Sequence, residues 1–330
     1  MDTYLSRSTT DAVKGLFLAL VFITHIMGYY ADGGVALPAW ADTAVRLTLN
    51  PLGQMVVVMF LFYSGYGVMC AIMAKGSAYV DAMPVRRILG VAANFAVAVL
   101  VFYVVRIAIG LGAEPPRTLA LSLIGWESVG NSNWYIFDIL ILYLATYTAF
   151  KVCRTKAGAL AALALLCVAA IAVLSVAKPY WWSDTLAAYP LGALLAYRRQ
   201  QVEEVAKRHY WLLFAAALAV FAATYLAGHH ATALVHNVRS LAFASLVVLA
   251  TMRLRFQPRA FGWIGANLFP LYIYQRLPMM VLSTVGGGFV LREYPVAFFV
   301  LSALITVGIA LAYRFFEIKF HTHGRALTQR

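Results

Sequence analysis

Two ionisable side chains within one apolar stretch are the first candidates for chemistry in this sequence. Lys14 and His25 stand eleven positions apart. At about 100° per residue, this spacing brings both side chains to one face of an α-helix, roughly 16 Å apart along its axis. An imidazole can accept or donate a proton near neutral pH. The spacing therefore predicts a helix with a cation near one surface and a potential general base deeper in an apolar layer.

The composition indicates which solvent surrounds these residues. Hydrophobic residues make up 63% of the 330-residue chain, charged residues make up 12%, and the mean hydropathy is +0.79. A soluble domain is about 45–50% apolar and about 25% charged, so these values favour a lipid environment. The formal net charge is +13, and the basic residues lie in short gaps between apolar runs. That placement favours orientation in a membrane over nucleic-acid binding, and we expect membrane lipid as a partner and no nucleic acid.

Apolar stretches long enough to cross a bilayer, roughly 20 residues each, recur along the whole chain. We predict an all-α, polytopic membrane protein with about ten transmembrane helices and a single domain over residues 1–330. The sixth of these helices is short. The predicted spans are residues 11–30, 52–74, 85–111, 133–150, 157–177, 185–197, 210–227, 235–252, 261–284 and 294–316.

The distribution of basic residues predicts the orientation of these spans. With ten crossings, 19 of the 26 Lys and Arg residues fall on the side of the N-terminus. The positive-inside rule then places both termini in the cytoplasm. The first apolar run lacks a small-x-small cleavage site, so it is interpreted as a retained helix and not as a signal peptide. Residues 31–51 and 114–133 are expected as outer loops.

Several sequence landmarks follow the order of one known family. Lys14-x10-His25 resembles the Arg/Lys-x10-His signature of the membrane-bound acyltransferase family 3, and the resemblance covers about residues 8–320. Gln275 stands where the family often has a histidine, and the usual proline after Glu317 is absent. The other similar segments are the aromatic-rich residues 60–67, the basic helix entry 84–88, the Trp-Tyr segment 133–144 and residues 271–278.

This resemblance implies transfer of an acyl group from cytoplasmic acyl-CoA to a hydroxyl of a saccharide or another cell-envelope acceptor. Acetyl is the default expectation for the acyl group, and the inner (plasma) membrane of a bacterium is the expected location. His25 would act as the general base, and no metal is expected because CoA is a good leaving group. Asp138 is predicted at a depth close to that of His25. A buried carboxylate there could fix the imidazole tautomer and stabilise the imidazolium.

Three basic residues are candidates for binding the CoA phosphates. Lys14, Arg86 and Arg87 are all expected near the inner surface. Arginine binds phosphate in a bidentate fork, whereas lysine acts as a point charge. The alternatives are charges that only set the topology and, for Lys14, an ion pair with Asp11 one turn earlier.

Three further residues are candidates for substrate binding. Ser64 lies mid-span beside Gly65 and Gly67, where small residues favour close helix packing over a nucleophilic serine. Trp134 and Tyr135 are expected at the outer boundary. Aromatic residues are common there, and they can also stack on a sugar ring.

Alternative interpretations remain open from the sequence. His25 could be a neutral histidine hydrogen-bonded between helices, and Asp138 could bond at a helix start near Asn133. The second functional hypothesis is a non-catalytic transporter or flippase for an envelope glycan or lipid, which should show two related halves with broken helices. A membrane scaffold would leave the Lys14-x10-His25 pattern unexplained. The remaining outer polar residues, read as loop residues, are His229, His230, His236 and Arg239.

Overall fold

The computed structural model describes residues 4–52, 54–228 and 232–328, and no strand occurs in this part of the chain. The side chains of residues 46–48, 50, 51 and 316–328, which include the predicted landmark Glu317, lie outside the description. Eight helices of the described chain are long and apolar enough to cross a membrane. The chain is therefore an all-α polytopic membrane protein. These helices are α1 (Arg7–Asp32), α3 (Met55–Lys75), the run Ser77–Ala108, α7 (Trp134–Val152), α8 (Lys156–Ala177), α10 (Arg199–Leu226), α11 (Ala233–Arg253) and the first part of α16 (Pro295–Thr328).

The other two predicted spans are shorter or interrupted. The sixth is α9 (Ala188–Tyr197), which begins three residues later than predicted. The ninth was predicted as one helix, and this is wrong. It consists of the three short helices α12 (Arg259–Ala266), α13 (Leu268–Tyr274) and α14 (Arg276–Thr284). The number of crossings and the side of each terminus stay predictions.

Polar side chains mark the two breaks in this ninth segment. At Asn267 the side-chain amide donates to the carbonyl oxygen of Trp263 (2.7 Å) and its oxygen accepts from Arg314 (3.3 Å). At Gln275 the side-chain amide donates to the carbonyl oxygen of Tyr272 (3.0 Å). Interrupted helices at membrane depth need such partners inside the protein.

The run Ser77–Ala108 is also irregular near its inner end. It consists of α4 (Ser77–Met83), the π-helical turn η1 (Pro84–Leu89) and α5 (Gly90–Ala108). Pro84 has no N–H and cannot continue the α-helical bonding pattern. The resulting wide turn carries Arg86 and Arg87. The expected loops contain short elements, which are α2 (Ala39–Leu52), α6 (Pro116–Leu123), η2 (Tyr180–Trp182), η3 (Val285–Gly288) and α15 (Phe289–Glu293).

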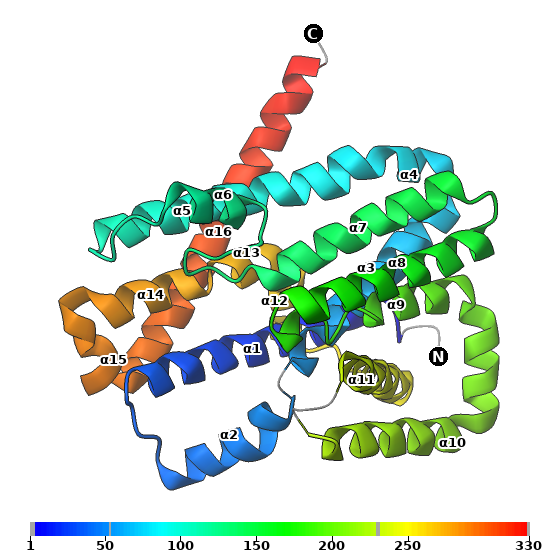
Figure 1. Cartoon of the computed structure of the whole chain (residues 1–330), viewed down its shortest axis with the longest axis horizontal. Helices are drawn as coiled ribbons and strands as arrows, with labels where there is room; N and C mark the ends of the chain where they lie inside the picture. The colour runs from blue at the N-terminus through cyan, green and yellow to red at the C-terminus, as the bar shows by residue number, and fades with distance from the viewer. Residues whose placement is uncertain (1–3, 53, 229–231, 329–330) are drawn as a thin grey trace.

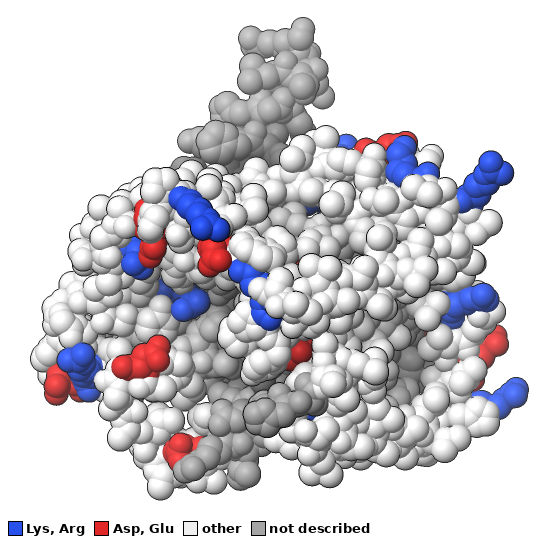
Figure 2. Space-filling model, in the orientation of Figure 1, with Lys and Arg blue, Asp and Glu red and all other residues white. Residues whose placement is uncertain are grey.

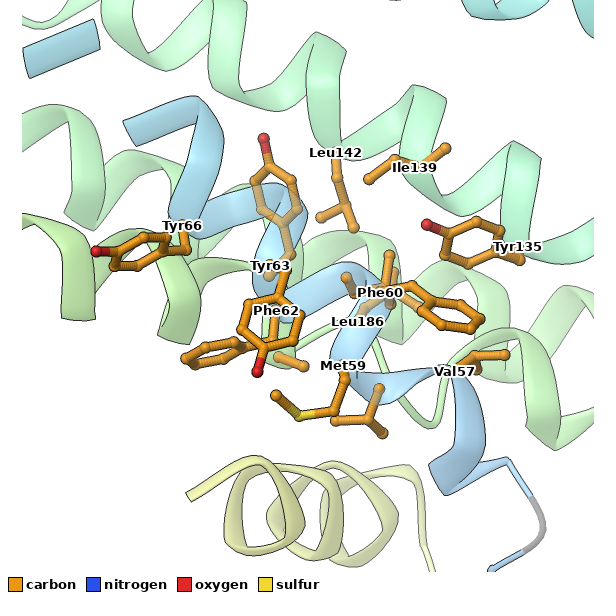
Figure 3. Packing of buried hydrophobic residues seen from close by; sticks show 14 of the residues in the cluster. Val57, Met59, Phe60, Phe62, Tyr63, Tyr66, Tyr135, Ile139, Leu142 and Leu186 are labelled. Carbon is orange, nitrogen blue, oxygen red and sulfur yellow. The ribbon is translucent and has the colours of Figure 1, made fainter. Parts of the chain in front are cut away.

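Helix α3 lies at the centre of the hydrophobic core, and its side chains face Tyr135, Ile139 and Leu142 of α7 (Figure 3). It also packs closely against α9. A Cβ atom built on Gly65 would lie 2.9 Å from the carbonyl carbon of Tyr189, and one on Gly192 of α9 would lie 2.9 Å from that of Phe62. Two helix backbones therefore meet at these glycines. A Cβ on Gly67 would meet nothing within 4 Å. The predicted close packing holds for Gly65 and is wrong for Gly67.

The long helices α1, α7 and α8 run along the longest axis of the molecule (Figure 1). The turn between α9 and α10 lies at one end of this axis, and α2 and α15 lie at the other. On the face shown in Figure 2, charged side chains lie at the right-hand end and are scattered over the left half as far as the middle of the molecule, with uncharged surface between the two groups.

Candidate active site

His25 lies in the C-terminal part of α1 and is partly buried. Its Nδ1 atom is shielded from solvent and has no hydrogen-bond partner among the described residues. The guanidinium of Arg276, the first residue of α14, acts on the imidazole electrostatically. A histidine that joined two helices through Nδ1 would have a hydrogen-bond partner there, and His25 has none among the described residues.

Asp138 on α7 is fully buried, and neither carboxylate oxygen has a hydrogen-bond partner among the described residues. No direct bond to His25 is present in this structure, so the predicted pair stays a hypothesis. The hydroxyl of Tyr272 on α13 lies close enough to both Asp138 and Arg276 for their charges to act on it.

Ser64 is brought together with Tyr135 in the interior. The Ser64 hydroxyl interacts with the phenols of both Tyr135 and Tyr143 on α7. The ring of Tyr135 packs edge-on against that of Tyr272, with 5.2 Å between centroids. Trp134 lies 6.4 Å from the ring of Tyr135 and is only partly buried. Two of the three predicted substrate-binding residues, Ser64 and Tyr135, thus face one buried polar region.

Arg87 connects this region to the end of the molecule that carries η1. Its Nε atom donates to the hydroxyl of Tyr79 (3.0 Å), and its guanidinium interacts with Tyr143. Tyr143 in turn contacts Ser64. A series of polar side chains therefore leads from Arg87 through the protein interior toward Tyr272 and Arg276.

The other two predicted phosphate ligands are placed differently. Lys14 forms an ion pair of 2.7 Å with Asp11, as one alternative interpretation proposed, and Asp11 also lies 3.7 Å from Arg7. Arg86, like Arg87, is exposed on η1. Of the three basic residues, Arg87 is the one that interacts with the buried polar region, through Tyr143.

A second polar cluster was not predicted. His236 and Arg239 lie on α11 and are buried, so their assignment to an outer loop is wrong, while His229 and His230 fall outside the described residues. His236 Nδ1 lies 3.5 Å from a carboxylate oxygen of Asp184. Burial raises the pKa of Asp184 to about 7, although Arg239 acts to lower it.

This second cluster holds segment 178–187 against neighbouring helices. The side-chain amide of Asn237 donates to the carbonyl oxygen of Ser183 (2.7 Å), and its oxygen accepts from the N–H of Ala187 (3.1 Å). Ser240 donates to the carbonyl oxygen of Asp184 (2.7 Å). Arg239 donates to carbonyl oxygens at the end of α10, those of Thr224 and Gly228. These bonds give the cluster a structural role.

The sequence analysis did not identify two residues of the site, Arg276 and Tyr272. Arg276 could have been recognised from the sequence. Arg276 is a cation inside an apolar segment, a type of residue that is costly in lipid and often functional. Tyr272 carried no comparable signal, because tyrosine is common in membrane helices. Its closeness to both Arg276 and Asp138 follows only from the fold.

Comparison with known families identifies the family of the chain. A family model described as an acyltransferase domain, that of acyltransferase family 3, matches residues 9–314. The comparisons with curated proteins and with solved structures find no match. The matched region spans nearly the whole chain and contains His25, Asp138 and Arg276. The chain belongs to acyltransferase family 3.

Proposed function

We propose that this protein transfers an acyl group, acetyl in the simplest case, from cytoplasmic acyl-CoA to a hydroxyl of a saccharide or other envelope acceptor. The acceptor would face the outer side of a bacterial inner membrane. The observation that carries the proposal is the partly exposed His25 imidazole deep in α1, unpartnered at Nδ1 and beside Arg276. Family membership supports acyl transfer as the general reaction.

In the proposed reaction His25 removes the proton from the acceptor hydroxyl as its oxygen attacks the thioester carbonyl carbon. The carbon–sulfur bond then breaks, and the CoA thiolate takes the proton from the imidazolium. An ester and free CoA thiol are formed, and His25 returns to its neutral state. Arg276 places a positive charge where the carbonyl oxygen becomes negative, which lowers the barrier.

The remaining candidate residues would position the two substrates. Asp138 would act through Tyr272 and Arg276, since it does not bond to His25 directly. Arg87, with Lys14 and Arg86, would supply positive charge that attracts the anionic donor. Trp134 is suited to stack on a sugar ring, because it is only partly buried. Ser64 and Tyr135 would contact the reacting end of the donor from the buried polar region.

The test is acyl transfer by the purified protein with labelled acetyl-CoA and envelope extract. His25→Ala should lower the rate by about 10²–10⁴-fold, the usual contribution of a positioned base. His209→Ala on α10 is a matched control, because His209 is exposed. Full transfer by His25→Ala would refute the assignment. Movement of an acceptor across the membrane without release of CoA would instead favour a flippase.

A further inference from the structure

A cavity of 710 Å³ lies where α3 ends and α9 passes into α10. Its lining combines positive charge, aromatic rings and amide groups. Arg198 and Arg199 supply the charge, Tyr66 and Tyr197 the rings, and Gln200 and Gln201 the amides. This combination suits a ligand with both phosphate groups and an aromatic base.

The positive charge of this cavity is only partly neutralised. Arg198 is exposed, donates to the side-chain oxygen of Gln201 (3.0 Å) and lies over the Tyr197 ring (5.1 Å). Among the described residues, no carboxylate pairs with Arg198. Arg199 pairs with Glu203 (2.7 Å). Two arginines and one paired carboxylate leave a net positive site that can attract an anion.

A stripe of α3 residues leads from the cavity toward the candidate active site. Cys70, Gly67 and Ser64 follow one another at intervals of three residues, so each neighbouring pair lies about 60° apart around the helix and the stripe turns through about 120°. Cys70 lines the cavity. Gly67 is exposed although it lies in the middle of a mostly buried helix, and a Cβ there would meet no atom within 4 Å. Ser64, one turn further on, contacts Tyr135 and Tyr143.

We infer that this cavity binds the phosphorylated adenosine end of acyl-CoA, with the thioester arm running over Gly67 toward Ser64. This inference rests on the proposed function. Arg198 and Arg199 would contact the phosphates, and a tyrosine ring would pack against adenine. Gly67 would be a positioning residue, since the absence of a side chain leaves the route open. This phosphate site differs from the one that the sequence predicted at Lys14, Arg86 and Arg87. Arg87 still interacts with Tyr143, which contacts Ser64 at the end of the proposed path of the thioester arm.

Binding of free coenzyme A, measured by calorimetry on the protein in nanodiscs, tests the cavity without requiring turnover. Arg198→Gln should weaken the affinity by about 10–100-fold, the usual loss for a charged hydrogen bond. Arg208→Gln is the control, because Arg208 is exposed on the same helix and outside the cavity. Unchanged affinity in Arg198→Gln, with loss in Arg86→Gln or Arg87→Gln, would overturn the inference.

A second pair of variants tests the route. Gly67→Leu should lower acyl transfer by about a hundredfold, as expected when a reacting group is misplaced, while binding of 3′,5′-ADP is retained. Gly308→Leu is matched to it, because Gly308 is an exposed glycine on α16 with no atom within 4 Å of an added Cβ. Equal transfer by both variants would overturn the route.

These measurements separate the inference from the proposed function. If coenzyme A binds and Arg198→Gln weakens binding, but no acyl group is ever transferred, the cavity assignment stands and the proposed reaction fails. If transfer depends on His25 and is insensitive to both Arg198→Gln and Gly67→Leu, the reaction stands and the cavity assignment fails.

Discussion

The contact between α3 and α9 allows one substitution to be analysed quantitatively. In Gly65→Ala the added Cβ would lie 2.9 Å from the carbonyl carbon of Tyr189 and 3.2 Å from its Cα, and closer still to the carbonyl oxygen. These atoms belong to the backbone, so no rotamer change can move them away. The two helices must separate, although Phe62 and Tyr189 on either side of the contact are buried.

The expected cost of Gly65→Ala follows from two opposing effects. Overpacking a buried contact costs about 1–3 kcal/mol, and backbone atoms that cannot yield place this site near the upper limit. Alanine in place of glycine returns about 0.5–1 kcal/mol through helix propensity. A net loss of about 2 kcal/mol in the free energy of unfolding is expected. Gly192→Ala, on the facing helix, should cost a similar amount, and the double variant should cost less than the sum.

Thermal unfolding of the purified protein in one detergent measures this loss. Gly65→Ala should melt several degrees below the unsubstituted protein, whereas Gly67→Ala, two residues away on the same helix, should melt at the same temperature or higher. The two variants make the same chemical change and differ only in the space available to the methyl group. Equal melting temperatures for the two variants would refute the packing argument.

Three further changes test other parts of the structure. Asp138→Asn should leave the melting temperature equal or higher, because it removes a buried carboxylate with no hydrogen-bond partner among the described residues. The same variant should lower acyl transfer, whereas a large drop in its melting temperature would show that the carboxylate is paired. Stability should fall as the pH rises from about 4 to 7, by at most about 4 kcal/mol, because Asp184 has a higher pKa in the folded protein than in the unfolded chain. Melting curves at pH values across this range test the effect. Asp184→Asn, with Arg239 unchanged, should make the melting temperature less dependent on pH, and the same pH dependence in the variant and the unsubstituted protein would contradict the argument. Lys178→Gln should lower the free energy of unfolding by about 2 kcal/mol. The Lys178 ammonium lies 4.1 Å from the centroid of the Trp126 ring, donates to the backbone carbonyl oxygen of Trp126 and is largely buried. Denaturant or thermal unfolding measures the loss, and an unchanged free energy would show that the contact is not stabilising.

Most of the transmembrane helices could be predicted from the sequence. Apolar length alone located α3 and α8 within a few residues, since a helix in lipid must satisfy its own backbone. The ninth segment was predicted as continuous because apolar residues recur over the length of a whole span. Its polar residues Asn267 and Gln275 mark the breaks, but whether such residues interrupt a helix depends on partners such as Arg314, which lie far away in sequence.

The candidate site was predictable only in part. The spacing of Lys14 and His25 and the family landmarks located the imidazole. Arg276, which acts on that imidazole, lies on α14, and no spacing rule relates this helix to α1. Gly65 and Gly67 show the same limit, because both are small residues on one helix and only the neighbouring helix decides which one lies in a contact.

The shortness of α9 affects how far the two substrates of such an enzyme must travel. Ten residues of α-helix rise only about 15 Å, roughly half of a hydrocarbon layer of about 30 Å. The preceding segment, residues 178–187, turns back into the protein to meet α9 and is held there by Asn237 and Ser240. In the proposed reaction, a helix of this length beside α3 would shorten the path along which a donor from one compartment and an acceptor from the other approach each other.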